Sequence, residues 1–516
     1  MTLIKDFFRK HFFGIIGAIF VGCLMVGPQV YFIIKNQTAY KGIYMLEGDA
    51  ERHYLSREAA YLKFGKVTNP YIKGAQGNPN VPYSEIEGIV AYPSKWFGIS
   101  IPNLNLIYKF VCPALIFFLF YFLVFKILAD RVWAISGAAL IVMGGELLSV
   151  LGIKNLIFWK YAYDQFAVYA RPINPQFSSL FFGAFLIILL SNLENQKKWK
   201  KVVLGIILGV SFYVYFYTWS FLLVICGMWF LVSVLKKKID FSPVWIVVGG
   251  IIVGLPALKA FYSSLLHPGY RELSEVAMVH ATHKPVIGLV ATIATIAFIY
   301  LYGFSSVDTI KKNFLLICIL ATWVVNNQQV ITGVNIQSGH YHWYINAPIY
   351  IIILITTLHQ VCVKYEIGIK TKYVLAGIIF LLSFASATLM QRSSYYFWNE
   401  TYLNYQDLSV VINSLKQTQD KESVVLANDK ASELINLFGG FYIFWSEHAG
   451  FYLYSDNRRQ YTQNWIVNNP KYYLEDRAPK IDIVVKNNKT DEWIAIDSSW
   501  KLIAESGDWQ AFQVVR

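Results

Sequence analysis

The chain has 516 residues, of which 56% are hydrophobic, 17% aromatic and only 15% charged. This composition is too apolar for an ordinary soluble protein of that length and indicates an integral membrane protein with several spans. The formal net charge is +13, but the basic residues stand in short clusters between apolar runs. That distribution is typical of the positive-inside pattern of membrane proteins and argues against a nucleic-acid partner.

The first predicted span covers residues 12–34, which is long enough to cross a hydrocarbon core of about 30 Å. Lys5, Arg9 and Lys10 precede it, as they would in a signal peptide. No small-residue cleavage site follows the apolar run, so we interpret it as an uncleaved first span.

An outer loop, residues 35–104, follows the first span and begins with acidic residues. Apolar residues recur at helical spacing from Tyr54 to Leu62, which predicts an amphipathic helix along the membrane interface. Asp49 or Glu51 at the start of that helix would serve as a general base for an acceptor hydroxyl. The alternative is an ordinary solvated helix start, where acidic residues are also favoured.

This loop resembles the start of the GT-C superfamily of polyprenyl-phosphate-sugar-dependent membrane glycosyltransferases, including mannosyltransferase-like and aminoarabinose-transferase-like members. The resemblance rests on the acid after the first span, on the Tyr-Leu-x-Arg segment from Tyr54, on Asn69-Pro70-Tyr71, and on the layout of the whole chain. The sequence has no obvious Trp-Trp-Asp-like motif of oligosaccharyltransferases.

The resemblance implies an inverting transfer from a polyprenyl-phosphate-linked sugar to a hydroxyl of a glycan, lipid or protein acceptor. Asp49 is the expected base and Glu51 its partner or alternate. The residues that follow are expected to bind substrate, and these are Arg52, His53 and Tyr54.

Further apolar segments bring the predicted number of spans to about eleven. Basic clusters fall on alternate connections together with the N-terminus, which predicts a multi-pass plasma-membrane protein with a cytoplasmic N-terminus and an extracytoplasmic C-terminal domain. The predicted spans after the first are 105–128, 132–150, 177–192, 202–217, 219–235, 243–262, 286–303, 314–330, 343–361 and 373–390.

Two charged residues stand near the outer ends of predicted spans. Glu146, in a Gly-Gly-Glu-Leu sequence, is either a substrate-binding acid or a side chain that reaches the lipid headgroups. Arg171 suits a lipid phosphate because its guanidinium donates paired, charge-assisted hydrogen bonds. Headgroup anchoring is the alternative, and a resemblance to an Arg-x-x-x-Pro segment of related membrane glycosyltransferases favours the phosphate site.

Two later outward segments supply further donors. Arg271 and Lys284 in the loop 263–285 would bind a phosphate leaving group or the surface membrane lipids. A run of amides from Asn326 would be costly in lipid, so it must line a wet cavity or be buried in protein. The donors expected toward a phosphate or sugar there, with structural packing as the alternative, are Gln337, His340 and His342.

No cofactor is demanded by these patterns, and neither a phosphate-binding glycine loop nor a zinc-type cysteine spacing is present. A divalent ion would be held by Asp49, Glu51 and His340 if their loops converge.

The sequence divides into a transmembrane domain, residues 1–391, and a C-terminal domain, residues 392–516. From about residue 421, strand-like runs at 423–427 and 481–485 alternate with helix-like runs at 430–437 and 459–467. A hairpin with its turn at Ser506-Gly507-Asp508 ends the chain. The expected fold is therefore an α-helical polytopic membrane protein with a small C-terminal α/β domain.

Three other functions compete with glycosyl transfer. One is that of a non-catalytic assembly or stability factor, for which replacing Asp49 would be harmless. A polysaccharide polymerase or ligase is also polytopic, but it usually has its large loop late in the chain. A flippase or transporter of lipid-linked glycans would carry broken helices in related halves and polar residues near mid-bilayer. Here the polar residues concentrate near the ends of spans, which favours chemistry at the membrane surface.

Overall fold

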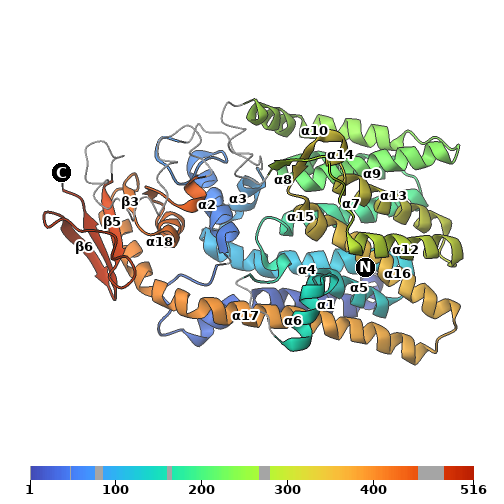
Figure 1. The fold of residues 1–516 in the computed structure, drawn as a ribbon, viewed down its shortest axis with the longest axis horizontal. Coiled ribbons are helices and arrows are strands. Elements are labelled where there is room, and N and C mark those ends of the chain that lie inside the picture. Colours follow the sequence, from blue (N-terminus) through green and yellow to red (C-terminus); the bar gives the residue numbers. More distant parts are fainter. Residues whose placement is uncertain are drawn as a thin grey trace. The chain divides into compact units, whose positions relative to one another are not determined.

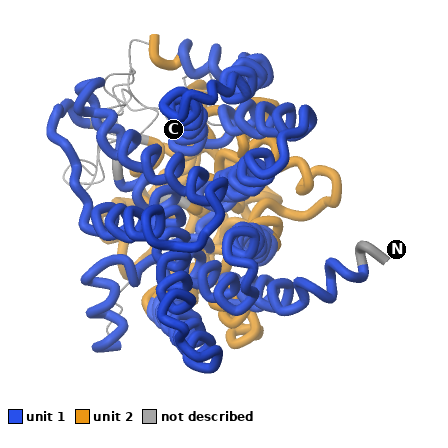
Figure 2. Tube along the Cα trace, turned by 90° about the vertical axis from the view of Figure 1, so that its right-hand side faces the viewer, with its two compact units in different colours: residues 1–26, 108–263, 277–393 blue, residues 27–107, 264–276, 394–516 orange. Residues whose placement is uncertain are grey.

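The structure is a computed structural model that describes residues 2–46, 48–75, 85–159, 165–266, 279–450 and 481–515. The chain forms two compact units, which Figure 2 colours separately. Unit 1 comprises residues 1–26, 108–263 and 277–393, and unit 2 comprises residues 27–107, 264–276 and 394–516. The predicted domain division at residue 391 stays a prediction.

Apolar helices dominate the first three quarters of the chain (Figure 1). Within the described ranges, eight helical segments are long and apolar enough to cross a membrane, and α5 and α12 are shorter apolar helices at two other predicted spans. Helix α8 lies at the remaining predicted span. The helices are α1 (Thr2–Lys35), α4 (Ile101–Leu128), α5 (Arg131–Met143), α6 (Val150–Phe158), α7 (Gln176–Glu194), α8 (Lys198–Val214), α9 (Phe216–Leu235), α10 (Ser242–Leu265), α12 (Leu289–Phe304), α13 (Thr309–Asn326), α16 (Ala347–Lys364) and α17 (Ile369–Thr418).

One predicted span end is wrong. Helix α5 ends at Met143 rather than at residue 150, because Gly144 and Gly145 follow and a short 3-10 turn, η1 (Gly145–Leu148), replaces the helix. Helix α17 contains the predicted span 373–390 and continues beyond it to Thr418, with 50 residues in all. Its second half is amphipathic, and the buried residues recur at helical spacing at Leu408, Val411, Ile412 and Leu415.

Unit 2 contains α2 (Gly48–Phe64), α3 (Ile86–Phe97) and a five-stranded sheet. The strand order is β4-β3-β5-β7-β6, with β3 parallel to β4 and β5, and β7 antiparallel to both β5 and β6. The strands are β3 (Val424–Leu426), β4 (Tyr442–Ile443), β5 (Ile483–Asn487), β6 (Lys501–Ser506) and β7 (Trp509–Gln513).

The α/β character predicted for the end of the chain is confirmed. Strands β3 and β5 occupy the two predicted strand-like runs, and α18 (Asp429–Leu434) lies in the first helix-like run. The terminal hairpin turns at Gly507, whose φ of 55° is left-handed and therefore suits glycine. The second predicted helix, residues 459–467, lies outside the described residues.

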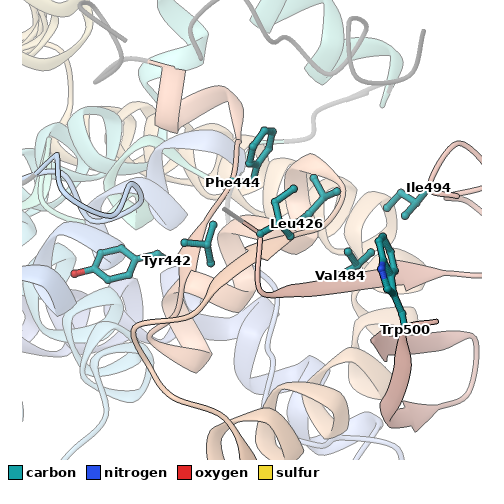
Figure 3. Close-up of a cluster of buried hydrophobic side chains, with 8 residues drawn as sticks. Leu426, Tyr442, Phe444, Val484, Ile494 and Trp500 are labelled. Carbon is teal, nitrogen blue, oxygen red and sulfur yellow. The ribbon is translucent and has the colours of Figure 1, made fainter. Parts of the chain in front are cut away.

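A hydrophobic core holds this sheet together (Figure 3). Side chains from β3, β4 and β5 form it with Ile494 and Trp500, and Phe64 at the end of α2 packs against it. The first loop adds a second cluster, in which Tyr71 and Ile72 pack on Ile443, and the Tyr71 carbonyl accepts a 2.9 Å hydrogen bond from the Ile443 amide. Within unit 2, the first loop therefore packs against the C-terminal sheet.

Candidate functional site

Helix α2 buries its charged residues. Glu51, Arg52, Arg57 and Glu58 are each at most 2% exposed. The alternative of an ordinary solvated helix start is therefore wrong for Glu51, which is buried. Burying a charge is costly unless it is paired or hydrogen-bonded, and unit 2 supplies such a partner. Asp49 lies in the first turns of α2, but its side chain is outside the described part of the structure.

Glu51 is held by an amide. The Asn105 side chain donates a 2.5 Å hydrogen bond from Nδ2 to Glu51 Oε1, and the same Nδ2 lies 3.0 Å from the Tyr44 hydroxyl oxygen. The Tyr44 hydroxyl in turn donates to the Pro102 carbonyl at 2.7 Å. The carboxylate is thereby fixed to the first turns of α4.

Arg52 is held by a carboxylate from the C-terminal part of unit 2. Arg52 Nε donates to Glu433 Oε2 at 2.6 Å, and Glu433 Oε1 lies 2.5 Å from His448 Nδ1. Burial alone would raise the pKa of Glu433, but the hydrogen bond with His448 and the charges of His448 and Arg52 bring that pKa below its ordinary value. Glu433 is therefore a stable anion between two donors.

His53, on the next position of α2, stacks on the same network. Its ring lies 5.0 Å from the His448 ring at an angle of 18°, and its Nδ1 is 3.3 Å from the Tyr71 hydroxyl. Tyr54 is half-buried beside it, with ring centroids 6.0 Å apart. Three of the residues predicted to bind substrate, Arg52, His53 and Tyr54, thus lie together on α2, and Arg52 is engaged in an ion pair.

A second group of buried acids lies further along α2. Arg57 Nη2 is 3.0 Å from Glu87 Oε1 of α3, and both side chains are at most 3% exposed. Glu58 Oε2 is buried and has no hydrogen-bond partner among the described residues. Burial, followed by the charges of Glu87 and Glu51, raises the pKa of Glu58 well above its ordinary value. Glu58 therefore keeps its proton to a higher pH than an exposed glutamate.

We expect Glu58→Gln to flatten the pH dependence of stability. A carboxyl whose folded-state pKa is raised favours the folded state below its unfolded pKa of about 4.3, and that contribution is lost as pH rises through the folded pKa. The thermal unfolding midpoint of the parent, measured in detergent, should fall relative to that of the variant as pH rises from about 4. Glu422→Gln, at an exposed position, serves as the control, and equal pH slopes for Glu58→Gln and parent would contradict the assignment.

Unit 1 contains a cluster of donors and aromatic rings. Arg171 Nη1 donates to the Tyr344 hydroxyl at 3.0 Å, and the Tyr344 ring lies 5.4 Å from the His340 ring. His340 Nδ1 is 2.6 Å from the Tyr215 hydroxyl, and the Tyr217 hydroxyl donates to Gln337 Oε1 at 2.8 Å. The structure thus brings together three predicted donors, Arg171, Gln337 and His340. The three tyrosines that join them were missed, because Tyr215, Tyr217 and Tyr344 look like ordinary aromatic residues in apolar segments.

The remaining predicted residues lie apart from this network or outside the described structure. His342 is half-buried with its ring 4.9 Å from that of Trp343. Glu146 lies in η1, and it lines a small pocket with Tyr169 and Trp343. Lys284 is exposed, and its carbonyl accepts from Gln329 at 3.1 Å. Arg271 lies outside the described residues.

The amide-rich segment is largely used in structure. Asn326 Nδ2 donates to the Tyr350 hydroxyl at 3.2 Å, and Asn346 Nδ2 donates to Asn326 Oδ1 at 2.8 Å. Asn327 exchanges side-chain hydrogen bonds with the backbone of Val286 at 2.7 and 3.2 Å. The amides were expected either to line a wet cavity or to be buried in protein. The second expectation is confirmed for Asn326, which is buried.

Lys109 is a further candidate that the sequence analysis missed. It is 0% exposed within the apolar helix α4, and its ammonium donates to the Ala170 carbonyl at 2.9 Å, one residue before Arg171. The available signal was a lysine inside an apolar span, which indicates a functional or buried polar contact.

The described residues contain no group of three His, Cys, Asp or Glu side chains placed to hold one metal ion. The side chain of Asp49 is outside the described residues, so the set of Asp49, Glu51 and His340 suggested for a divalent ion stays a prediction.

No family model matches the chain, and no curated protein matches it. Among solved structures, the chain is similar to ArnT from Cupriavidus metallidurans bound to undecaprenyl phosphate, with 10% identity, a TM-score of 0.45, and coverage of 94% of this chain and 97% of that one. It is also similar to the Archaeoglobus fulgidus oligosaccharyltransferase in the apo form, with 14% identity, a TM-score of 0.46, and coverage of 91% and 69%. AglB from Archaeoglobus fulgidus, in complex with an inhibitory peptide and a dolichol-phosphate, is similar with 14% identity, a TM-score of 0.44, and coverage of 93% and 70%.

Proposed function

We propose that this chain is an integral-membrane glycosyltransferase that transfers a sugar from a polyprenyl-phosphate carrier to an acceptor hydroxyl at the outer face of the membrane. The observation that carries the proposal is the anchoring of α2 in unit 2. Glu51 and Arg52 are both fixed by buried partners, and Asp49 precedes them on the same helix. A helix so fixed holds its first turns in one position, which a general base requires.

In the proposed reaction the acceptor oxygen attacks the anomeric carbon while Asp49 takes the hydroxyl proton. The bond from that carbon to the phosphate oxygen breaks, and the electron pair leaves with the phosphate. A single displacement of this kind inverts the anomeric centre. The leaving group is already a stable anion, so no strong general acid and no cofactor are required. Glu51 is a positioning residue, because its carboxylate is buried against Asn105.

The donor phosphate would be bound by the cluster in unit 1. The Arg171 guanidinium offers paired donors, and its hydrogen bond to the Tyr344 hydroxyl fixes the orientation of the guanidinium plane. When the Tyr215 hydroxyl donates to His340 Nδ1, the imidazole proton stays on Nε2, which then donates to an anion. Gln337 belongs to this cluster and would add a contact to the phosphate or sugar. Three further donors stay predictions for the same phosphate, and these are Arg271, Lys284 and His342.

The test is transfer of a labelled sugar from a polyprenyl-phosphate donor by the full chain in proteoliposomes, with the product configuration determined by NMR. Arg171→Lys keeps the charge but loses the paired donors. We expect it to raise KM for the donor about 10- to 100-fold, since a hydrogen bond to a charged group contributes about 1.5–3 kcal/mol. Arg392→Lys, an exposed arginine elsewhere, is the matched control.

The alternatives give different products. A polymerase or ligase would move a preassembled glycan, so the product would grow by a block rather than by one sugar. A flippase would move the lipid between leaflets with no bond broken. Either result, or retention of the anomeric configuration, would rule out the proposed function.

A further inference from the structure

An apolar groove runs between α1, α5 and α17 of unit 1. Its walls include Phe13 of α1, Ile135 of α5 and Phe380 of α17, and it encloses about 800 Å³. Tyr373, Gly377 and Phe380 recur at the spacing of one helix face, so the α17 wall is a continuous stripe about two turns long. This volume is within the usual range of small-molecule sites, about 300–1,000 Å³.

The groove is open to its surroundings. Phe13 is 67% exposed although it forms a wall. A Cβ atom added to Gly377 would meet no other atom within 4 Å, which shows that the side of α17 facing the groove is not filled by protein. In a bundle of apolar helices, such a surface is covered by lipid chains.

A positively charged side chain, that of Arg131, lines the groove. Arg131 begins α5, is exposed, and has no hydrogen bond or ion pair with any residue that the structure describes. The neighbouring Asp130 is engaged, because its carboxylate accepts from the amides of Val132 at 2.9 Å and Trp133 at 3.2 Å. Arg9 lies one turn before Phe13 on α1, so helical spacing places it on the same face.

We infer that this groove binds one anionic glycerophospholipid, with an acyl chain along Phe13, Ile135 and Phe380 and the phosphodiester on Arg131. The charges favour a phosphodiester, which carries one negative charge. A terminal phosphate monoester, as on a polyprenyl carrier, carries between one and two charges and would be repelled more strongly by Asp130. The groove lies at the N-terminal end of α5, whereas the pocket lined by Glu146 lies beyond its C-terminal end, about 20 Å away at the helical rise. The inference does not depend on the proposed function.

The experiment measures phosphatidylglycerol binding to the full chain in detergent by native mass spectrometry. We expect one saturable site in the parent, at least tenfold weaker binding in Arg131→Gln, and loss of that site in Gly377→Leu, whose side chain would fill the groove. Gly227→Leu is the matched control, because a Cβ added at Gly227 on α9 also meets no atom within 4 Å. Lys238→Gln is the control for charge, and both controls should bind as the parent does.

Three competitor arms separate the sources of the phosphate. Phosphatidylcholine binding equal to that of phosphatidylglycerol would show unspecific lipid contact and overturn the inference. Displacement by undecaprenyl phosphate at an equal or lower concentration would make the carrier lipid the occupant, and displacement by inorganic phosphate would show an anion site without a groove. Either result overturns it as well. If Gly377→Leu does not fold, Phe13→Ser at an exposed wall position should weaken binding at least fivefold, and parent-like binding there would refute the site.

Discussion

Asp49→Asn is expected to lower kcat for sugar transfer by about 10²- to 10⁴-fold, the usual contribution of a general base. The substitution keeps the size of the side chain and removes only its capacity to take a proton. KM for the donor should change little, because the donor phosphate is assigned to Arg171 and His340. The measurement is steady-state transfer in proteoliposomes at saturating donor.

Glu51→Gln is the informative comparison for this prediction. The Gln side chain retains an oxygen that accepts from Asn105, so we expect a much smaller loss of kcat, about tenfold or less. Asp49→Glu should keep the acidic limb of the pH–rate profile, and Asp49→Asn should lose it. A parent-like profile for Asp49→Asn, or a larger loss for Glu51→Gln, would transfer the role of base to Glu51 or another group.

The sequence predicted the membrane part of the fold because hydropathy is a local property. Every apolar run of about 18 residues had to be a helix, since a backbone in lipid satisfies its hydrogen bonds internally. Hydropathy does not predict where a helix ends, because a helix can continue after its apolar run. Helix α17 does so, since its residues after 390 follow an amphipathic pattern whose apolar face is buried in unit 2. The terminal hairpin was readable from Gly507 between two alternating runs.

The candidate site was predicted only in part. Arg171 and His340 were selected by charge and by their position near span ends, and the structure joins them through Tyr344. The partners of α2 were missed because Glu433 and His448 are separated from Arg52 by 381 and 396 residues along the chain, and hydrophobic periodicity carries no information on such pairing. Buried acids such as Glu58 also resemble exposed ones in a sequence, since only the folded surroundings shift their pKa.

Arg52→Met is expected to lower the free energy of unfolding by about 3–5 kcal/mol, because it leaves the buried Glu433 carboxylate without its guanidinium partner. Both side chains are at most 3% exposed, so water cannot replace the lost contact. The loss should be seen by chemical unfolding in detergent. It should also lower kcat, since the anchor of α2 is lost, while donor KM stays near the parent value.

The pairing, rather than the volume of Arg52, is tested by a second substitution. In Arg52→Met/Glu433→Gln the uncompensated charge is gone, and we expect at least half of the lost stability to return, because removing both partners of a buried ion pair costs far less than removing one. Lys63→Met is the matched control, since Lys63 also joins α2 to the C-terminal part of unit 2 through a 2.9 Å pair with Glu422, but with side chains 37% and 47% exposed. The free energy of unfolding of Lys63→Met should be lower than that of the parent by less than about 1 kcal/mol, as for other surface ion pairs. Equal losses for Arg52→Met and Lys63→Met, or no recovery in the double variant, would mean that the buried pair does not anchor α2 and that the position of Asp49 depends on other contacts.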